Sequence, residues 1–215
     1  MNWQRARTDE KKSERKEAIF KAAFALFKKN GYDKVSFNGI AVEAGFTKSN
    51  MYRYFSSKEE IFLNVFADLF EKWFEDCSNQ LQKLEQNETI EHFAKTWVMT
   101  LMSHPKFLDL TPLLFLSLEK NSSFEQLLAF KTQAKYLLYK ISIEIGRIYP
   151  DIQGENAFKF LTLSYAATAN YWAASTQSEP LKKIYQLDEF TELKPNFEKD
   201  LTTSVEIIIR GIKAS

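Results

Sequence analysis

Residues that interrupt helices are scarce in this chain of 215 residues, which contains only six glycines and five prolines. Between them, apolar residues recur mostly three and four positions apart, the spacing that places side chains on one face of an α-helix. The pattern predicts an all-α protein. Short helices are expected after Ser36 and Thr47, and longer helices over about 12–30, 57–77, 89–103, 106–119, 123–148, 154–178 and 197–213. The stretch 179–196 is expected to be the least regular part.

The composition is that of an ordinary soluble protein, with 45% hydrophobic and 27% charged residues. No stretch approaches the ~20 consecutive apolar residues that a membrane span needs, and Met1–Arg7 lacks the apolar core of a signal peptide. The single cysteine, Cys77, excludes an internal disulfide and fits a reducing compartment. We therefore expect a cytoplasmic protein without membrane contact. The two histidines have no cysteine near them, so we expect no metal site and no cofactor.

Charge is distributed unevenly along the chain. Residues 1–56 hold twelve Lys and Arg against six Asp and Glu, a net charge of +6, and residues 57–215 carry −5. A small basic head is what a nucleic-acid-binding domain needs, because neutralising phosphates supplies most non-specific affinity. A solvated basic helix would show the same charge, so the spacing of the residues has to separate the two interpretations.

The head has the layout of a helix-turn-helix unit, in which a second short helix enters the major groove of DNA. Two short helices follow the first long one, and Gly45 separates them. Met51 and Phe55 are expected to turn inward from the second short helix, so that its polar residues face outward. Asn50 is suited to bidentate contact with adenine and Arg53 to contact with guanine.

Other residues around this helix are suited to phosphate. Tyr52 can combine contact to a thymine methyl group with a phosphate hydrogen bond. A cation such as Lys58 in the first turn of its helix opposes the helix dipole, which a docked phosphate would explain. The alternative is a set of solvated polar faces. The residues expected to contact DNA are Ser36, Thr47, Lys48, Ser49, Asn50, Tyr52, Arg53, Tyr54 and Lys58.

Several short motifs in this region stand at the spacing of a known family: Gly31-Tyr32, Ile40-Ala41, Ala44-Gly45, Tyr52-x-Tyr54-Phe55 and Lys58-Glu59. Over about residues 13–73 the chain resembles the DNA-binding domain of TetR/AcrR-type bacterial transcriptional regulators. The resemblance implies a three-helix DNA-binding head over residues 1–56 and a larger helical body for ligand binding and dimerisation over residues 57–215. Beyond residue 73 the chain resembles the family only in length and number of helices.

Two late helices carry apolar seams that suit helix–helix packing, because their apolar residues recur at intervals of three and four. The resemblance implies that these helices form a four-helix bundle with the same pair of a second subunit. Packing within one chain is the alternative. The residues expected at the dimer interface are Phe158, Leu161, Tyr165, Thr168, Trp172, Leu201, Val205, Ile208 and Ile212.

Aromatic and thioether side chains are frequent in the middle helices, where the resemblance implies a small-molecule pocket whose occupation shifts helix 57–77. Such residues suit a lipophilic or planar ligand, although an aromatic stripe at helical spacing is also typical of plain core. The residues expected to line the pocket are Trp97, Met102, His104, Phe107, Phe115, Tyr136, Tyr139, Tyr165 and Trp172.

These expectations combine into a dimeric repressor that binds a palindromic operator in double-stranded DNA and leaves it when a small effector enters the body. Two alternatives remain open. One is a helical enzyme acting on a hydrophobic substrate, although the chain shows no phosphate loop, dinucleotide fingerprint, nucleophile elbow or metal spacing. The other is a DNA-binding regulator controlled by a protein partner. We expect no catalytic residues.

Overall fold

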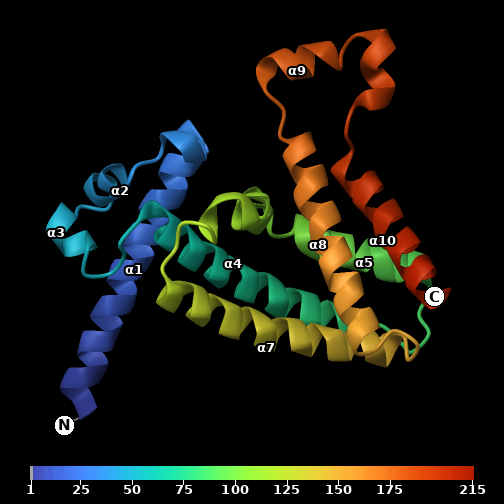
Figure 1. The fold of residues 1–215 in the computed structure, drawn as a ribbon, viewed down its shortest axis with the longest axis horizontal. Coiled ribbons are helices and arrows are strands. Elements are labelled where there is room, and N and C mark those ends of the chain that lie inside the picture. Colours follow the sequence, from blue (N-terminus) through green and yellow to red (C-terminus); the bar gives the residue numbers. More distant parts are fainter. Residues whose placement is uncertain (1) are drawn as a thin grey trace. The chain divides into compact units, whose positions relative to one another are not determined.

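The computed structural model describes residues 2–215, with side chains from Ser13 onward (Figure 1). Met1 and the basic side chains before Ser13, which contribute to the charge of the head, lie outside the described part. Every element described is helical, which confirms the all-α prediction. No helix in the described range is long and apolar enough to cross a membrane. The elements are α1 (Asn2–Asn30), η1 (Tyr32–Lys34), α2 (Phe37–Glu43), α3 (Lys48–Met51), α4 (Lys58–Leu81), α5 (Ile90–Met102), α6 (Pro105–Leu110), η2 (Leu114–Leu118), α7 (Phe124–Ile148), α8 (Glu155–Ser175), α9 (Glu179–Ile184), η3 (Asp188–Leu193) and α10 (Phe197–Lys213).

The chain forms two compact units that share two helices. The first unit comprises Met1–Val65 and Leu114–Phe130, and the second comprises Phe66–Leu113 and Lys131–Ser215. This division differs from the expected boundary between residues 56 and 57, because the first two turns of α4 pack with the head. It also assigns to the first unit a segment, 114–130, that the sequence places well inside the body.

The first unit is held together by small and aromatic side chains from α1 to α4. Ile19 and Ala23 of α1 are buried with Ile40 of α2. The ring of Phe62 in α4 lies edge-on to the rings of Phe27 (6.0 Å) and Tyr32 (5.2 Å). This core fixes the positions of the two short helices α2 and α3 relative to α1.

The second unit has an aromatic core between α4, α5, α6 and α8, and α10 packs against both α5 and α8. The ring of Trp97 in α5 contacts Trp73 of α4 at 5.5 Å and Phe160 of α8 at 5.1 Å between centroids. Trp73 stacks on Phe107 of α6 at 5.4 Å. Cys77 is buried in this unit as a free thiol, and burial raises its pKa to about 12.

Two predicted elements differ from the observed ones. The helix expected over 106–119 is broken: α6 ends at Leu110, Pro112 follows, and residues 114–118 form a single π-helical turn. The helix expected over 154–178 ends at Ser175. The irregular stretch 179–196 holds two short helices, α9 and η3, which Figure 1 shows beyond the ends of α8 and α10.

Candidate DNA interface

The short helix α3 has exposed polar residues in its first turn, and buried apolar residues follow them. Met51 and Phe55 are buried as predicted, and the ring of Phe55 lies 6.1 Å from that of Phe20 in α1. The side chains of Lys48, Ser49 and Asn50 are exposed. Since the buried pair fixes the rotation of the helix, the three polar side chains are held outward together.

Tyr52 follows directly at the end of α3 and remains 54% exposed. Its ring lies 4.9 Å from the ring of Phe37 at the start of α2, and Lys48 Nζ lies 5.8 Å from its centroid. Arg53 next to it is exposed. The contact with Phe37 holds the Tyr52 ring from both helices of the motif, so this aromatic side chain is positioned before any ligand arrives.

Ser36 and Thr47 cap the two short helices. Ser36 Oγ accepts a hydrogen bond from Gly39 N at 3.0 Å, and Thr47 Oγ1 accepts one from Asn50 N at 3.3 Å. Both residues are exposed, and their hydroxyl groups keep an O–H to donate. The predicted phosphate contacts of these residues are therefore compatible with their capping role.

Tyr54 has a partner that the sequence reasoning missed. Its hydroxyl accepts a hydrogen bond from Arg15 Nη1 of α1 at 3.2 Å, and this bond raises the pKa of Arg15. Arg15 lies one turn before the buried Ile19, and that spacing is the signal that could have placed it on the side of α1 that faces the motif. Arg15 adds an exposed cation beside the end of the recognition segment.

The amino group of Lys58 has partners within the chain, whereas the sequence predicts that it contacts a DNA phosphate. Its Nζ donates to the backbone carbonyl of Tyr32 at 3.1 Å and lies 4.4 Å from the centroid of the Tyr32 ring. Tyr32 is buried, and burial raises its pKa to about 12. Lys58 thus fastens η1 to the start of α4 and is only half exposed.

The start of α4 is also tied to the segment 114–130 of the same unit. Ser117 Oγ donates to the hydroxyl of Tyr32 at 3.2 Å. The side-chain amide of Asn64 donates to Gln126 Oε1 at 2.8 Å. These bonds join the head to a segment that lies some sixty residues or more further along the sequence.

Comparison with protein families identifies both parts of the chain. The family described as bacterial regulatory proteins, tetR family, matches residues 19–65. The family described as tetracyclin repressor-like, C-terminal domain, matches residues 67–215. The chain belongs to the tetR family of bacterial regulatory proteins. The helix-turn-helix of this family is the DNA-binding element of its transcriptional regulators.

Individual relatives agree. An uncharacterized HTH-type transcriptional regulator, YfiR of Bacillus subtilis (strain 168), is 29% identical over 83 residues, which are 39% of this chain and 38% of that protein. Among solved structures, a TetR/AcrR-family regulator from Thermobifida fusca shares 19% identity and a TM-score of 0.54, over 92% of this chain and 98% of that one. The fatty acid degradation regulator FadR from Bacillus halodurans shares 17% identity and a TM-score of 0.54, over 94% and 95%. At these identities the structures show that the fold is shared.

In this tetR-family chain, the nine residues expected to line a pocket do not share one environment. Trp97 and Phe107 are buried in the core of the second unit, and Phe115 is an exposed residue of the first unit. Exposed side chains belong to the solvent-facing surface of a single chain and so do not line its interior. Those on the second unit are Met102, Tyr136 and Tyr139.

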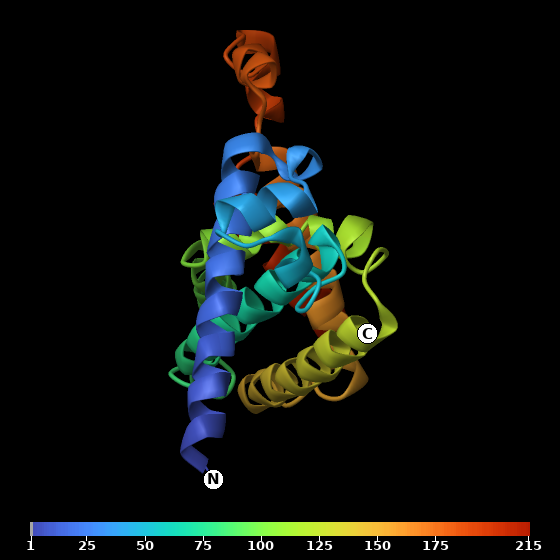
Figure 2. The same ribbon diagram turned by 90° about the vertical axis from the view of Figure 1, so that its left-hand side faces the viewer.

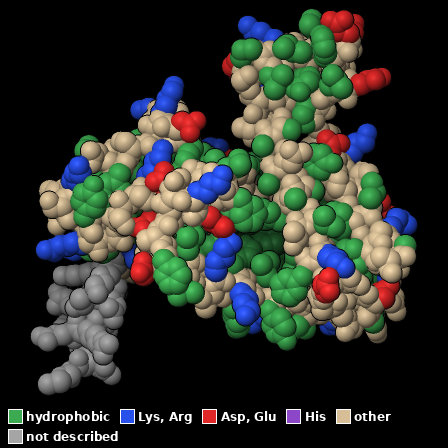
Figure 3. All heavy atoms as spheres, viewed as in Figure 1, with side chains coloured by type: hydrophobic (Ala, Val, Ile, Leu, Met, Phe, Trp, Pro, Cys, Tyr) green, Lys and Arg blue, Asp and Glu red, His purple; other side chains and the backbone are tan. Residues whose placement is uncertain are grey.

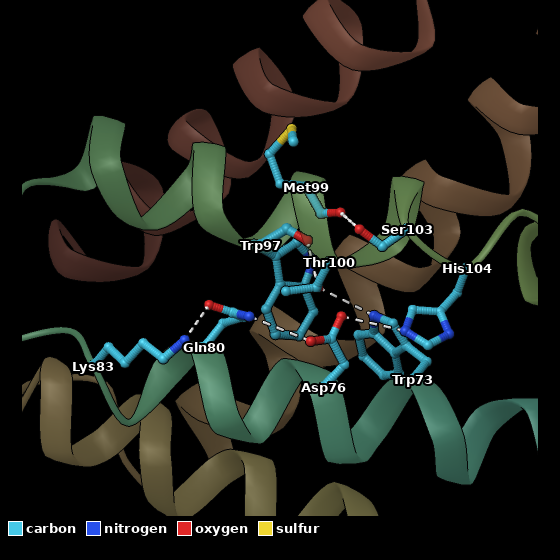
Figure 4. Close-up of polar contacts among 9 residues, drawn as sticks. All are labelled: Trp73, Asp76, Gln80, Lys83, Trp97, Met99, Thr100, Ser103 and His104. Atoms are coloured by element: carbon cyan, nitrogen blue, oxygen red, sulfur yellow. Dashed lines mark hydrogen bonds and ion pairs between the residues drawn. The ribbon is translucent and has the colours of Figure 1, made fainter.

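The three remaining pocket residues are half-buried and have polar partners. His104 Nε2 lies 3.2 Å from Asp76 Oδ2, a pair shown in Figure 4. Tyr165 donates its hydroxyl proton to the carbonyl of Thr111 at 2.8 Å. Trp172 Nε1 donates to Asp109 Oδ1 at 3.2 Å. These contacts join α4 to α5–α6 and α6 to α8.

Two buried polar atoms in the described part of the second unit lack hydrogen bonds. Trp97 Nε1 and Ser164 Oγ are buried, and neither has a hydrogen-bond partner among the described residues. Figure 4 shows Trp97 and Thr100 on the side of α5 that faces α4, whereas Met99 points away from it. Most buried polar groups in proteins are hydrogen-bonded. An unsatisfied N–H and hydroxyl near the Trp97–Phe160 contact are therefore unusual.

The apolar seams of α8 and α10, which were expected at a dimer interface, pack largely within the single chain. The two helices do pack together, and five of the nine residues are buried between elements of the second unit in the single chain. Phe158 is exposed, and Tyr165, Trp172 and Ile208 are half-buried. The buried five are Leu161, Thr168, Leu201, Val205 and Ile212.

Proposed function

We propose that this protein is a dimeric repressor that reads a palindromic operator with α3 and releases it when a small effector binds the second unit. The observation that carries the proposal is the exposed first turn of α3, with Lys48, Ser49 and Asn50 held outward by the buried Met51 beneath them. A regulator of this kind acts in the cytoplasm, where bacterial DNA lies, and needs no catalytic residues.

The chemistry of the exposed residues assigns them different roles. Asn50 can pair with adenine and Arg53 with guanine, each through two hydrogen bonds to a base edge. Tyr52, held by Phe37, contacts a thymine methyl group or a phosphate. Arg15 and the capping hydroxyls of the motif contact phosphates, which fixes the register of the head on DNA.

Dimerisation is supported by apolar side chains that remain exposed on the two helices of the second unit. Leu163 and Phe158 of α8 and Ile207 of α10 are exposed although they are large and apolar. Ala166, one turn after Leu163, would let a partner helix approach closely. An isologous interface repeats such a patch on both subunits, which places two copies of α3 on one duplex.

Effector binding is supported by the two unsatisfied polar atoms. An apolar or aromatic effector carrying a hydrogen-bond acceptor would satisfy the N–H of Trp97, and Ser164 would supply a second polar contact. The aromatic surroundings of Trp97, with Trp73 and Phe160, suit a flat or lipophilic molecule.

The DNA-reading role is tested with Asn50→Ala and Arg53→Ala in the full-length protein. Each change removes a bidentate base contact and is expected to weaken operator binding by about 1–3 kcal/mol, or roughly fivefold to more than a hundredfold, and to relax preference at one base pair. Fluorescence anisotropy with operator variants measures both effects.

Asn79→Ala serves as the matched control, because Asn79 is an exposed asparagine of α4 outside the motif. Its affinity should equal that of the unchanged protein. Operator binding that is the same in all three variants would contradict the assignment of α3 as the reading helix.

A further inference from the structure

Phe37, the first residue of α2, contacts the aromatic ring of Tyr52 at the end of α3. The two ring centroids lie 4.9 Å apart, with an angle of 31° between the ring planes. The two short helices lie side by side in the first unit (Figures 1 and 2). The contact therefore joins the segment proposed to contact bases to the helix that precedes it.

Phe37 has a fixed position because the first turn of α2 is itself fixed. The side chain of Ser36 caps this turn, and Ile40 of the same helix is fully buried in the core of the first unit. Phe37 is half-buried. Its ring therefore offers a neighbouring side chain an apolar surface that does not move.

Tyr52, in contrast, is a surface residue whose ring needs such a support. More than half of the residue is exposed, and the other side chain placed over its ring is the flexible Lys48, with Nζ 5.8 Å from the ring centroid. Figure 3 shows hydrophobic side chains on the surface of the head with Lys and Arg side chains beside them. An exposed side chain that changes rotamer must be immobilised when DNA binds, which lowers the affinity. Packing on Phe37 removes part of this cost in advance.

We propose that Phe37 is a positioning residue that determines the base preference of Tyr52, so that α2 sets the specificity at one base pair of each half-site. This inference rests on the proposed contact of Tyr52 with a thymine methyl group. That methyl group is a small apolar target in the major groove, so its recognition depends on where the tyrosine ring lies. A ring packed on Phe37 meets the methyl group in one place, whereas a ring without this support distributes its contacts over several places. Phe37 acts through Tyr52 and needs no base contact of its own.

The test replaces each thymine of the operator in turn by uracil, which lacks only the C5 methyl group, and measures binding of the full-length protein by fluorescence anisotropy. At one thymine of each half-site the unchanged protein should bind about fourfold more weakly to uracil, which is the value of one buried methyl group. Tyr52→Ala and Phe37→Ala should both lose this preference. Phe37→Ala should also bind the thymine operator about twofold to tenfold more weakly, because the tyrosine ring is no longer immobilised in advance.

Two further changes at position 37 separate positioning from folding. Phe37→Tyr keeps the aromatic ring and should keep the preference for thymine. Phe37→Leu keeps the apolar bulk that α2 needs but has no flat ring, and it should lose the preference. Phe24→Ala is the matched control, because Phe24 is also a half-buried phenylalanine of the first unit, and its ring contacts Phe27 of the same helix at 5.6 Å. It should keep the preference for thymine. Circular dichroism verifies that each variant stays folded.

Each other outcome rejects a different part of the inference. A preference that is lost in Tyr52→Ala but kept in Phe37→Ala and Phe37→Leu would overturn the role of Phe37 and leave the base contact of Tyr52 standing. A preference that is lost equally in Phe24→Ala would show a general loosening of the head, and would also overturn that role. Equal binding of thymine and uracil by the unchanged protein at every position would overturn the methyl contact of Tyr52 as well. A protein that selects no operator would overturn the proposed function together with this inference.

Discussion

Glu60 is a buried charged residue at the start of α4. Its side chain is only 3% exposed, and its carboxylate accepts three hydrogen bonds within the first unit. Oε2 accepts from the backbone N and the hydroxyl of Ser56 at 2.7 Å each, and Oε1 accepts from Ser123 N at 3.2 Å. Burial disfavours the charged form, but the hydrogen bonds from Ser123 and Ser56 outweigh it, so the pKa of Glu60 is lowered. One buried charge therefore joins the end of the DNA-reading motif to the start of α7.

Glu60→Gln is expected to destabilise the protein by about 1–3 kcal/mol at pH 7, because the amide presents N–H groups to donors that need acceptors. Since the folded pKa of Glu60 lies below its unfolded value, the carboxylate stabilises the fold at pH values above the unfolded pKa. This contribution is lost as the pH falls through the folded pKa. Urea unfolding at a series of pH values should therefore show the gap between the two proteins narrowing in acid.

Glu75→Gln is the control for this prediction, because Glu75 is an exposed glutamate of the same helix. It should change the free energy of unfolding by less than ~0.5 kcal/mol. Equal losses at the two positions, or a Glu60→Gln loss of the same size at every pH, would contradict the role given to the buried carboxylate.

The turn between α2 and α3 depends on a glycine. Gly45 has φ of 73°, a region that residues with a Cβ rarely adopt. Gly45→Ala is expected to destabilise the protein by about 1–2 kcal/mol and to weaken DNA binding, because the turn sets the angle between the two helices of the motif. Thermal unfolding and anisotropy measure the two effects.

Gly211 offers the opposite case on α10, since it is helical and a Cβ there would meet no neighbouring atom within 4 Å. Gly211→Ala should stabilise the helix by up to about 1 kcal/mol. Stabilisation by both changes would show that the turn at Gly45 does not require a positive φ.

The elements of this protein could be predicted wherever local chemistry determines them. Ser36 and Thr47 cap helices as the sequence indicates, and Met51 and Phe55 are buried as their spacing requires. The helix expected over 106–119 is interrupted at Pro112, and the π-helical turn after it was not foreseen. The family of the head could also be recognised, because its motifs lie within one continuous stretch of sequence.

Long-range partners could not be predicted in the same way. The bond between Arg15 and Tyr54 joins residues 39 positions apart, and the carbonyl bound by Lys58 belongs to a residue 26 positions away. Periodicity identified the seams of α8 and α10 but not the surface they pack against, which is why Leu201 and Val205, expected at a dimer interface, are internal core. The spacing of residues indicates which of them share a face of a helix. It does not indicate which other element packs against that face.

The proposed function requires that the whole molecule place two heads on one duplex. One α3 exposes too few residues to specify more than a short half-site, so an operator of useful length needs a second copy. In the proposed dimer, the exposed apolar side chains of α8 and α10 bring the two subunits together. The proposed function therefore depends on sequence-specific binding by a dimer.

Selection of binding sites from random duplex DNA by the purified protein, at near-physiological salt, tests whether the dimer binds a specific sequence. We expect enrichment of an inverted repeat whose half-sites lie about one helical turn, roughly 10 base pairs, apart. Only weak, salt-sensitive binding without any enriched sequence would contradict it.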